Sequence, residues 1–290
     1  MSVEFCYFNE SDYQSVCDFL IALNQRDRSH INWNWARWEW MYSHPYFDGA
    51  KKNTIGLWKD NHKVVGVAIY DLYYGEAFCE ALSQYNYLLP EIIKYAYQNF
   101  CDDEGIQIAI NDDDNEMKSL LIKQGYVKTE NTETVMRLEP FQANDYFLPD
   151  GFSFHEIDLI KDNMAYQTVI WKGFDHEGDM EELHKMINNP NPLPPHLQKN
   201  LCLAIMDKDG NFVSHCAFWF DKRTDYAYIE PLCTIPTHRH QGFAKILLLE
   251  LINRCYQMKI KDIFVISTMD FYKKMEFKKY ATYTFYGKKR

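Results

Sequence analysis

The order of the predicted secondary-structure elements occurs twice along this chain, and the repetition limits the folds open to it. In each half, a strand is followed by a helical region of roughly 40 to 50 residues, judged by its hydrophobic period. Two or three strands, a helix, a strand, a short helix and a final strand follow. The repeat is roughly 140 residues long, too long for the stacked units of a solenoid. We therefore expect two copies of one α/β unit.

The ends of the two halves show the repeat most directly. Residues 119–126 and residues 270–277 each form a short segment of helical character that ends on an aromatic residue at the start of the last strand. The copies are expected to meet near Pro140–Asp150, where turn residues separate two strand-like runs. We therefore predict one domain at residues 1–140 and a second at residues 151–290.

Composition and charge exclude several classes of protein. With 290 residues, 47% of them apolar, the chain can bury a real core, and wholesale disorder is ruled out. Residues 1–144 hold 22 of the 41 acidic residues but only 12 of the 31 basic ones, so this half carries the net charge of −10. Its surface has two interpretations, a field that attracts a cationic substrate or an ordinary solvated face. Acidic chains bind phosphate backbones poorly, so no nucleic acid partner is expected.

The sequence predicts neither a membrane partner nor a metal. No apolar run reaches the roughly 18 residues of a membrane span, and the first residues lack the layout of a signal peptide. The eight cysteines are scattered without a C-x-x-C pair, which favours reduced, buried thiols and a cytoplasmic location. The acidic run at residues 112–116 lacks the EF-hand glycine and is interpreted as the N-terminal cap of a helix.

Residues 226–267 are the most informative stretch. They read as a strand at 226–233, a turn, a helix that begins at Phe243, and a buried strand at 262–267. This order predicts a right-handed βαβ unit with parallel strands. Gly242 and Ala244 are small, so a phosphate can approach the unpaired N–H groups and the positive end of the helix dipole.

The turn of this unit resembles a known motif. Residues 232–244, Leu-Cys-Thr-Ile-Pro-Thr-His-Arg-His-Gln-Gly-Phe-Ala, resemble motif A of the GNAT superfamily of acetyl-CoA-dependent N-acetyltransferases. Residues 271–277, Phe-Tyr-Lys-Lys-Met-Glu-Phe, resemble the closing segment of the same family. The similarity of motifs covers roughly residues 226–280, and the element order extends it over 151–290 and, more faintly, over 1–140.

The resemblance implies a fold and a co-substrate. The fold is α/β, an α+β mixed sheet in two tandem GNAT-like domains, each with a mostly antiparallel central sheet, a splayed parallel strand pair and flanking helices. Acetyl-CoA is the implied co-substrate, with its pantetheine arm along the first strand of the splayed pair and its pyrophosphate on the turn. No metal is implied. The implied binding residues are Leu232, Cys233, Thr234, Arg239, His240, Gln241, Gly242, Phe243, Ala244 and Lys245.

Two residues are the candidates for catalysis. Tyr272 matches the tyrosine of the family that protonates the leaving thiolate, and its alternative interpretation is an ordinary core aromatic. Glu230 shares one face of its strand with Leu232 and Thr234 and is the candidate base, the alternative being a surface carboxylate or an ion pair. Glu276 departs from the family, which has glycine at that position.

The first half has the layout without the chemical residues. Residues 83–90, where the phosphate turn would be, contain no glycine, and Leu121 stands where the second half has Tyr272. We therefore expect a degenerate GNAT-like domain that is not catalytic and shapes the acceptor site. Residues 33–40 hold four tryptophans, which predict core packing or, alternatively, a platform for the acceptor.

The expected function is transfer of an acetyl group from acetyl-CoA to a primary amine of a small molecule or peptide by direct attack. Two alternatives stay open: a non-catalytic acyl-CoA-binding or interaction module, and a protein-modifying acetyltransferase. The acceptor amine cannot be named, because acceptor residues lie in the variable helical regions. A homodimer also stays open.

Overall fold

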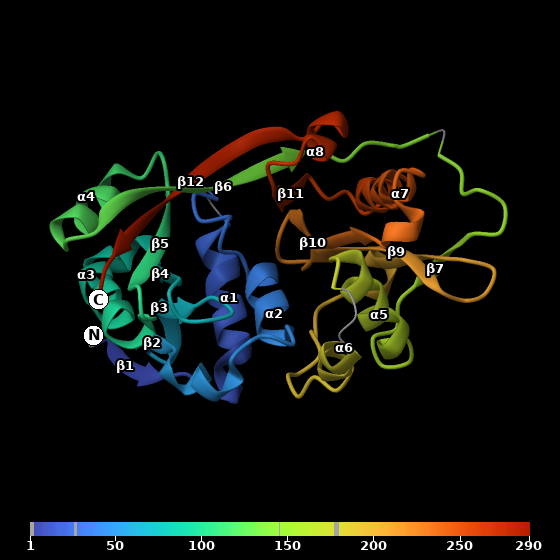
Figure 1. Ribbon diagram of the computed structural model, residues 1–290. Coiled ribbons are helices and arrows are strands. Elements are labelled where there is room, and N and C mark those ends of the chain that lie inside the picture. The colour runs from blue at the N-terminus through green and yellow to red at the C-terminus, as the bar shows by residue number, and fades with distance from the viewer. Residues whose placement is uncertain (1–2, 26–27, 145, 177–179) are drawn as a thin grey trace. The chain divides into compact units, whose positions relative to one another are not determined.

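The computed structural model describes residues 3–25, 28–144, 146–176 and 180–290 (Figure 1). Asp145, within the predicted boundary, lies outside the described residues. The chain divides into two compact units, which we treat separately. Unit 1 is drawn from residues 1–135, 266–268 and 279–290, and unit 2 from residues 136–265 and 269–278. The units therefore do not follow the linear halves, since the last strand counts with unit 1.

Unit 1 contains a four-stranded antiparallel sheet in the order β1-β2-β3-β4, and a second group in which β12 pairs with β5. Its helices are α1 to α4. The bounds are β1 Glu4–Tyr7, α1 Tyr13–Leu23, α2 Trp35–Ser43, β2 Gly56–Asp60, β3 Lys63–Tyr70, β4 Ala77–Ala81, α3 Leu89–Phe100, β5 Ile106–Asn111, α4 Asn115–Lys123 and β12 Lys278–Lys288. Strand β6, Val127–Leu138, has its first nine residues in unit 1.

Unit 2 is built on strands in the order β6-β11-β10-β9-β8-β7, where β6 contributes only its end. All of its described pairs are antiparallel except β10 with β11. The bounds are β7 Ser153–Glu156, α5 Asn163–Gly173, α6 Met180–Ile187, β8 Cys202–Met206, β9 Phe212–Phe220, β10 Tyr226–Thr234, α7 Phe243–Gln257, β11 Asp262–Ile266 and α8 Asp270–Lys274. Short 3-10 helices η1 Glu10–Asp12, η2 Gly49–Thr54, η3 Ser83–Leu88, η4 Lys199–Leu201 and η5 Pro236–His238 complete the fold.

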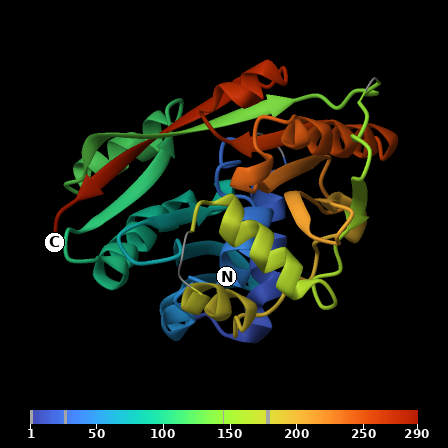
Figure 2. The ribbon, with the colours of Figure 1, turned by 45° about the vertical axis from the view of Figure 1, so that its right-hand side comes forward.

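The predicted mixed α/β fold is confirmed. Helix α7 covers one face of β9 and β10, and α5 lies on the other (Figure 1, Figure 2). Apolar residues of α7 recur at helical spacing, among them Leu247, Leu251 and Cys255, and all three are fully buried in the core of unit 2. Burial of this stripe fixes α7 on the sheet, so the turn before the helix is held rigidly at the end of β10.

No helix among the described residues is long and apolar enough to cross a membrane. A hairpin at residues 207–211 joins the antiparallel strands β8 and β9, and Asp207 accepts hydrogen bonds from the backbone N–H groups of Asp209 and Asn211 there, at 2.9 and 2.8 Å. The acidic run is also confirmed as a helix cap, because Asp114 accepts a 2.8 Å hydrogen bond from the N–H of Met117 at the start of α4.

Candidate functional site in unit 2

The parallel strands β10 and β11 separate after a short paired stretch. Residues Tyr226 to Tyr228 pair with Asp262 to Phe264, and the described register ends there. The second part of β10, from Ile229 to Thr234, keeps its antiparallel partner β9 on the other side. This half of the strand therefore presents one open edge, to which an extended group can add as a further strand would.

A β-bulge lies at the point where the strands separate. Ile229 pairs with Phe218 and Leu232 with Cys216, so Glu230 and Pro231 together face a single residue of β9. The peptide bond between Glu230 and Pro231 is cis. Beyond the bulge the burial alternates, with Glu230, Leu232 and Thr234 partly exposed and the residues between them buried. Phe218, Cys216 and Ser214 are alternate residues of β9 and share a face, so Leu232 and Thr234 lie on the same face as Ile229. The bulge therefore breaks the two-residue period, and the predicted common face with Glu230 is wrong.

Two aromatic residues hold Glu230. The indole Nε1 of Trp219 donates a 2.5 Å hydrogen bond to the carbonyl oxygen of Glu230, and the hydroxyl of Tyr228 donates to its Oε2 at 3.4 Å. Sequence reasoning missed both. Tyr228 lies two positions before Glu230, so the period of the strand contained that signal. Trp219 is placed by the register of β9 against β10, which the sequence does not reveal.

The turn after β10 leads into α7 through a left-handed residue. Gly242 is the N-cap of the helix with φ +85° and ψ 0°, a conformation that favours glycine. A Cβ built on Gly242 would meet nothing within 4 Å, so the space in front of the helix is open. Phe243 is buried and anchors the first turn, whereas His240, Gln241 and Lys245 are exposed.

The backbone N–H groups of this turn are available to a ligand. In the part of the chain that the structure describes, no acceptor is recorded for the N–H groups of residues 240–245, and the first recorded bond is from the N–H of Ile246 to the oxygen of Gly242, at 3.0 Å. Unpaired donors at the positive end of a helix of 15 residues are an anion-binding site. Exposed Lys245 adds a positive charge beside them.

Arg239 has a different surrounding from the turn amides. Its Nε donates to the carbonyl oxygen of Thr234 at 3.0 Å, and its Nη2 donates to the carbonyl oxygen of Gly173 at 2.9 Å. The same nitrogen lies 2.9 Å from a carboxylate oxygen of Asp175. The guanidinium thus ties the end of α5 to the turn, and this brace occupies the side chain that the sequence assigned to cofactor binding.

The main chain at the end of β10 is also partly engaged. The hydroxyl of Ser214 donates to the carbonyl oxygen of Cys233 at 2.8 Å, and Thr234 receives the bond from Arg239. A Cβ on Gly173 would come within 2.7 Å of the Cys233 Cβ and Sγ, so α5 approaches the strand as closely as a glycine allows. These contacts fix Cys233 and Thr234 and leave their second lone pairs for other donors.

Tyr272 lies on α8 and is 6% exposed. Its ring packs against Phe271 and Phe277, with ring centroids 5.2 and 5.4 Å away. Burial raises the pKa of the Tyr272 hydroxyl, and the nearby thiol of Cys216 and carboxylate of Glu230 raise it further. The phenol therefore keeps its proton at neutral pH. Because Tyr272 and Glu230 interact electrostatically, both candidate catalytic residues lie in the same part of unit 2. Their roles stay predictions.

The turn after α8 shows why glycine suits the position that Glu276 occupies. Glu276 has φ +68°, the left-handed conformation that glycine adopts most easily. The N–H of Phe277 then donates to the carbonyl oxygen of Tyr272 at 3.0 Å. In unit 1, Gly125 has φ +86° and Tyr126 donates to Leu121 at the same distance. The internal repeat is thus visible in backbone geometry even though the residues differ.

The tryptophan-rich segment of unit 1 is a packing element. Trp33, Trp35 and Trp38 are fully buried, and Trp33 stacks on Phe78 at 3.8 Å between ring centroids. The packing interpretation is therefore the correct one for these three residues.

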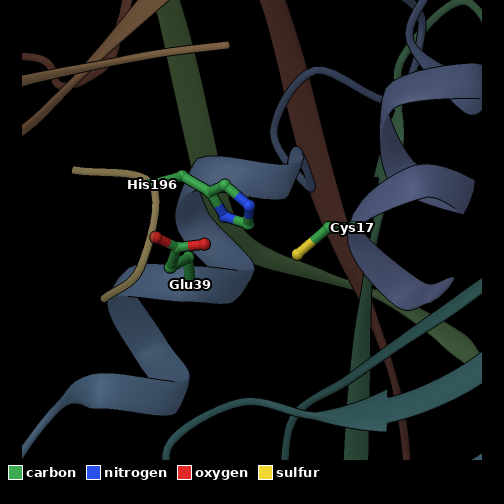
Figure 3. A group of neighbouring side chains, drawn as sticks. All are labelled: Cys17, Glu39 and His196. Atoms are coloured by element: carbon green, nitrogen blue, oxygen red, sulfur yellow. The ribbon is translucent and has the colours of Figure 1, made fainter. Parts of the chain in front are cut away.

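Helices α1 and α2 of unit 1 also enclose a buried acid. Figure 3 shows the side chains of Cys17 on α1 and Glu39 on α2 directed toward the space between these helices, and both residues are 0% exposed. The third labelled side chain, His196, belongs to unit 2.

Comparison with known proteins finds a family similarity over the site. Residues 165–277 match the sequence profile of the acetyltransferase (GNAT) family. This range includes β10, the turn, α7 and α8, so the similarity to the family covers the whole candidate site. Among curated protein sequences, no significant match was found.

Solved structures extend the similarity to the fold of nearly the whole chain. A tandem GNAT protein from the clavulanic acid biosynthesis pathway has a TM-score of 0.60 and 11% identity, covering 99% of this chain and 98% of its own. An acetyltransferase of the GNAT family from Colwellia psychrerythraea has a TM-score of 0.59 and 14% identity, with 100% of both chains covered. A GCN5-related N-acetyltransferase from Sphaerobacter thermophilus has a TM-score of 0.57 and 12% identity, covering 99% of this chain and 95% of its own.

Proposed function

We propose that unit 2 transfers an acetyl group from acetyl-CoA to a primary amine of a small molecule or peptide. The observation that carries the proposal is the junction of two features: β10 separates from β11, and its open edge leads to the unpaired N–H groups of residues 240–245 at the start of α7. The first feature suits an extended arm and the second a diphosphate. The GNAT domain found at residues 165–277 supports the same conclusion.

The binding residues follow from this junction. The amides of His240 to Lys245 would hold the diphosphate, each through a charge-assisted hydrogen bond that the helix dipole strengthens. The open edge from Leu232 to Thr234 would take the pantetheine arm by main-chain hydrogen bonds. The bound thioester supplies an electrophilic carbonyl carbon and a thiolate leaving group.

The two candidate catalytic residues would then handle the protons. The amine nitrogen bonds to the carbonyl carbon while the carbon–sulfur bond breaks, and Glu230 accepts the proton that the nitrogen loses. Tyr272 donates a proton to the departing sulfur, and the phenol recovers it from Glu230 through solvent. Burial keeps the phenol of Tyr272 protonated at neutral pH, so a proton is present for the departing sulfur.

A thiol-release assay tests the proposal. Aminoglycosides, polyamines, amino acids and peptide N-termini are offered with acetyl-CoA, and we expect release of free CoA with at least one amine. Gly242→Glu should abolish this release, whereas Gly210→Glu should not. Gly210 is the matched control because it has the same φ of +85° and the same open surroundings in the hairpin between β8 and β9. Binding of acetyl-CoA without turnover on any amine would favour a non-catalytic module and contradict the proposal.

A cytoplasmic location is part of the same proposal. It is supported by the cysteines: all eight lie in the described residues and no disulfide joins them, as is usual in a reducing compartment.

A further inference from the structure

Unit 1 contains a cavity at the place that corresponds to the cleft of unit 2. Strands β4 and β5 run parallel but share only one isolated bridge, between Glu76 and Gln107. Beyond this bridge their ends enclose a cavity of about 60 Å³ lined by residues of unit 1 alone. The space exceeds the roughly 10–15 Å³ that one water molecule needs. The two strands thus hold a chamber large enough for a small organic group.

The chamber opens into a wider groove of the same unit. The two spaces share the lining residues Ser29, His30, Ala81, Asn86 and Asp114, and the outer groove has a volume of about 420 Å³. A ligand can therefore place its recognised end in the chamber and extend outward through the groove.

A deeply buried amide marks the chamber as a binding site. Asn32 lines it and is 2% exposed. Among the described residues, no acceptor lies within hydrogen-bond distance of its side-chain Nδ2. An unpaired buried donor is destabilising, so such groups are rare unless a ligand or water completes them. A ligand that fills the chamber is therefore expected to carry a hydrogen-bond acceptor.

The charges of the chamber and groove add a second requirement. Glu80 and Asp114 line the chamber, and Glu116 lines the groove. His30 is the basic residue of both linings, and its imidazole lies 2.7 Å from one carboxylate oxygen of Glu80. Asp114 also caps α4. Acidic residues outnumber basic ones, so the lining favours a positively charged ligand.

We infer that unit 1 binds a small primary ammonium compound that carries a hydrogen-bond acceptor close to its nitrogen. The ammonium group pairs with Glu80, and the acceptor takes the hydrogen bond of Asn32. The inference is independent of the function proposed for unit 2. It also bears on the excess negative charge of the first half of the chain. The sequence left two interpretations of this charge, attraction of a cationic ligand or an ordinary solvated surface, and the inference favours the first.

Glycinamide is the probe, because it joins an ammonium group to an amide oxygen. Ethylamine lacks the acceptor and acetamide lacks the charge. Calorimetric titrations without acetyl-CoA should show saturable binding of glycinamide, with ethylamine and acetamide at least about tenfold weaker, since each loses one charge-assisted or buried hydrogen bond. In protein labelled with ¹⁵N-asparagine, glycinamide should shift the side-chain amide resonance of Asn32, identified by its loss in Asn32→Leu.

Two variants and a control complete the test. Glu80→Gln should weaken glycinamide binding about tenfold or more, because a charge-assisted bond becomes a neutral one. Asp103→Asn removes the same charge from an exposed residue of unit 1 outside the cavity and should bind as the wild type does. If Glu80→Gln does not fold, Asn32→Leu serves instead, since it removes an unpaired donor with little change in shape. Absence of saturable binding, equal binding of all three probes, or unchanged affinity in a folded Glu80→Gln or Asn32→Leu would overturn the inference. Because the readout is binding without acetyl-CoA, none of these results bears on acetyl transfer by unit 2.

Discussion

The turns that precede α7 in unit 2 and α3 in unit 1 occupy the same position in the repeat but present different backbones. The turn of unit 2 passes through Gly242 and leaves the N–H groups of residues 240–245 without a recorded acceptor among the described residues. In unit 1, the 3-10 helix η3 runs directly into α3, and Pro90 at the first turn has no N–H to offer. The helix start of unit 2 therefore has the unpaired donors that the proposed diphosphate site requires, whereas Pro90 removes one donor from the helix start of unit 1.

The clefts beside these turns differ in the same direction. In unit 2, the open edge of β10 leads to Glu230 and the buried phenol of Tyr272. In unit 1, Leu121 stands in the corresponding place on α4 and is fully buried, so no hydroxyl is available there. The chamber between β4 and β5 is instead lined by acidic and amide groups. The comparison shows that a buried core can preserve the order of secondary-structure elements while the residues that line the cleft differ between the two units.

The largest predicted effect comes from Gly242→Glu, which tests the difference between the two turns. A carboxylate placed at the turn faces the bound diphosphate, and like charges in contact cost several kcal/mol, so we expect the affinity for acetyl-CoA to fall about 1000-fold. Isothermal titration measures it. The control Gly210→Glu carries the same backbone strain and charge, and its affinity should stay at the wild-type value. Equal losses in both variants would show that the effect is not local to the turn.

The second prediction concerns the hydroxyl of Tyr272, which unit 1 lacks at the corresponding position, Leu121. Tyr272→Phe should lower kcat about 100-fold, the range of a lost general acid, and leave the affinity for acetyl-CoA unchanged. Tyr126→Phe, at the corresponding turn of unit 1, removes a hydroxyl from another buried tyrosine and should leave kcat unchanged. Steady-state kinetics at several pH values distinguishes the two. A wild-type kcat in Tyr272→Phe would remove the phenol from the reaction.

The third prediction concerns the buried carboxyl group of Glu76 in unit 1 and how it makes the free energy of unfolding depend on pH. Glu76, at the bridge between β4 and β5, shares Arg37 with Asp71 and Glu133. Burial raises the pKa of Glu76 from its ordinary value of 4.5 to about 8, and the neighbouring carboxylates of Asp71 and Glu133 contribute. The folded state therefore holds this proton above the pH at which the unfolded state releases it. The contribution of Glu76 to stability is complete below pH 4.5 and is lost as the pH rises through 8.

Replacing Glu76 measures this loss. At pH 9, Glu76→Gln should raise the free energy of unfolding of unit 1 by an amount on the order of 2 kcal/mol relative to the wild type, and at pH 4 by much less. Glu130→Gln, an exposed residue of the same unit, should show no such pH dependence. Urea unfolding at the two pH values gives the comparison. Parallel stability curves for Glu76→Gln and the wild type would contradict the account.

The smallest effect is expected at the paired left-handed turns. Glu276→Gly should stabilise unit 2 by about 0.5 kcal/mol, because relief of left-handed strain slightly exceeds the added entropy of glycine in the unfolded chain. Gly125→Ala, the reciprocal change, should destabilise unit 1 by about 1 kcal/mol. Urea unfolding measures both. A loss of stability in Glu276→Gly, or a gain in Gly125→Ala, would show that the two turns are not equivalent.

The sequence predicted elements whose signal is local. The strand expected at residues 226–233 agrees with β10 to within one residue, and the helix that begins at Phe243 has the expected start because Gly242 and an apolar stripe mark it. The common face predicted for Glu230, Leu232 and Thr234 from the strand period is interrupted by the β-bulge at Glu230 and Pro231, which the sequence does not reveal.

Features that depend on tertiary contacts could not be predicted in this way. The role of Arg239 depends on where α5 ends, because Gly173 and Asp175 are far from it in sequence. The last strand counts with unit 1 because β12 pairs with β5, a contact between residues more than 150 positions apart. The chamber of unit 1 needed both the separation of β4 from β5 and the burial of Asn32, and no linear pattern encodes either.

The most direct test of the account is a crystal structure of the full chain with bound CoA. We expect the diphosphate at the start of α7, within hydrogen-bond distance of the backbone N–H groups between His240 and Lys245, and no nucleotide between β4 and β5. A diphosphate bound to unit 1 would contradict the assignment of the two units. So would a structure with CoA bound in which those N–H groups contact only solvent.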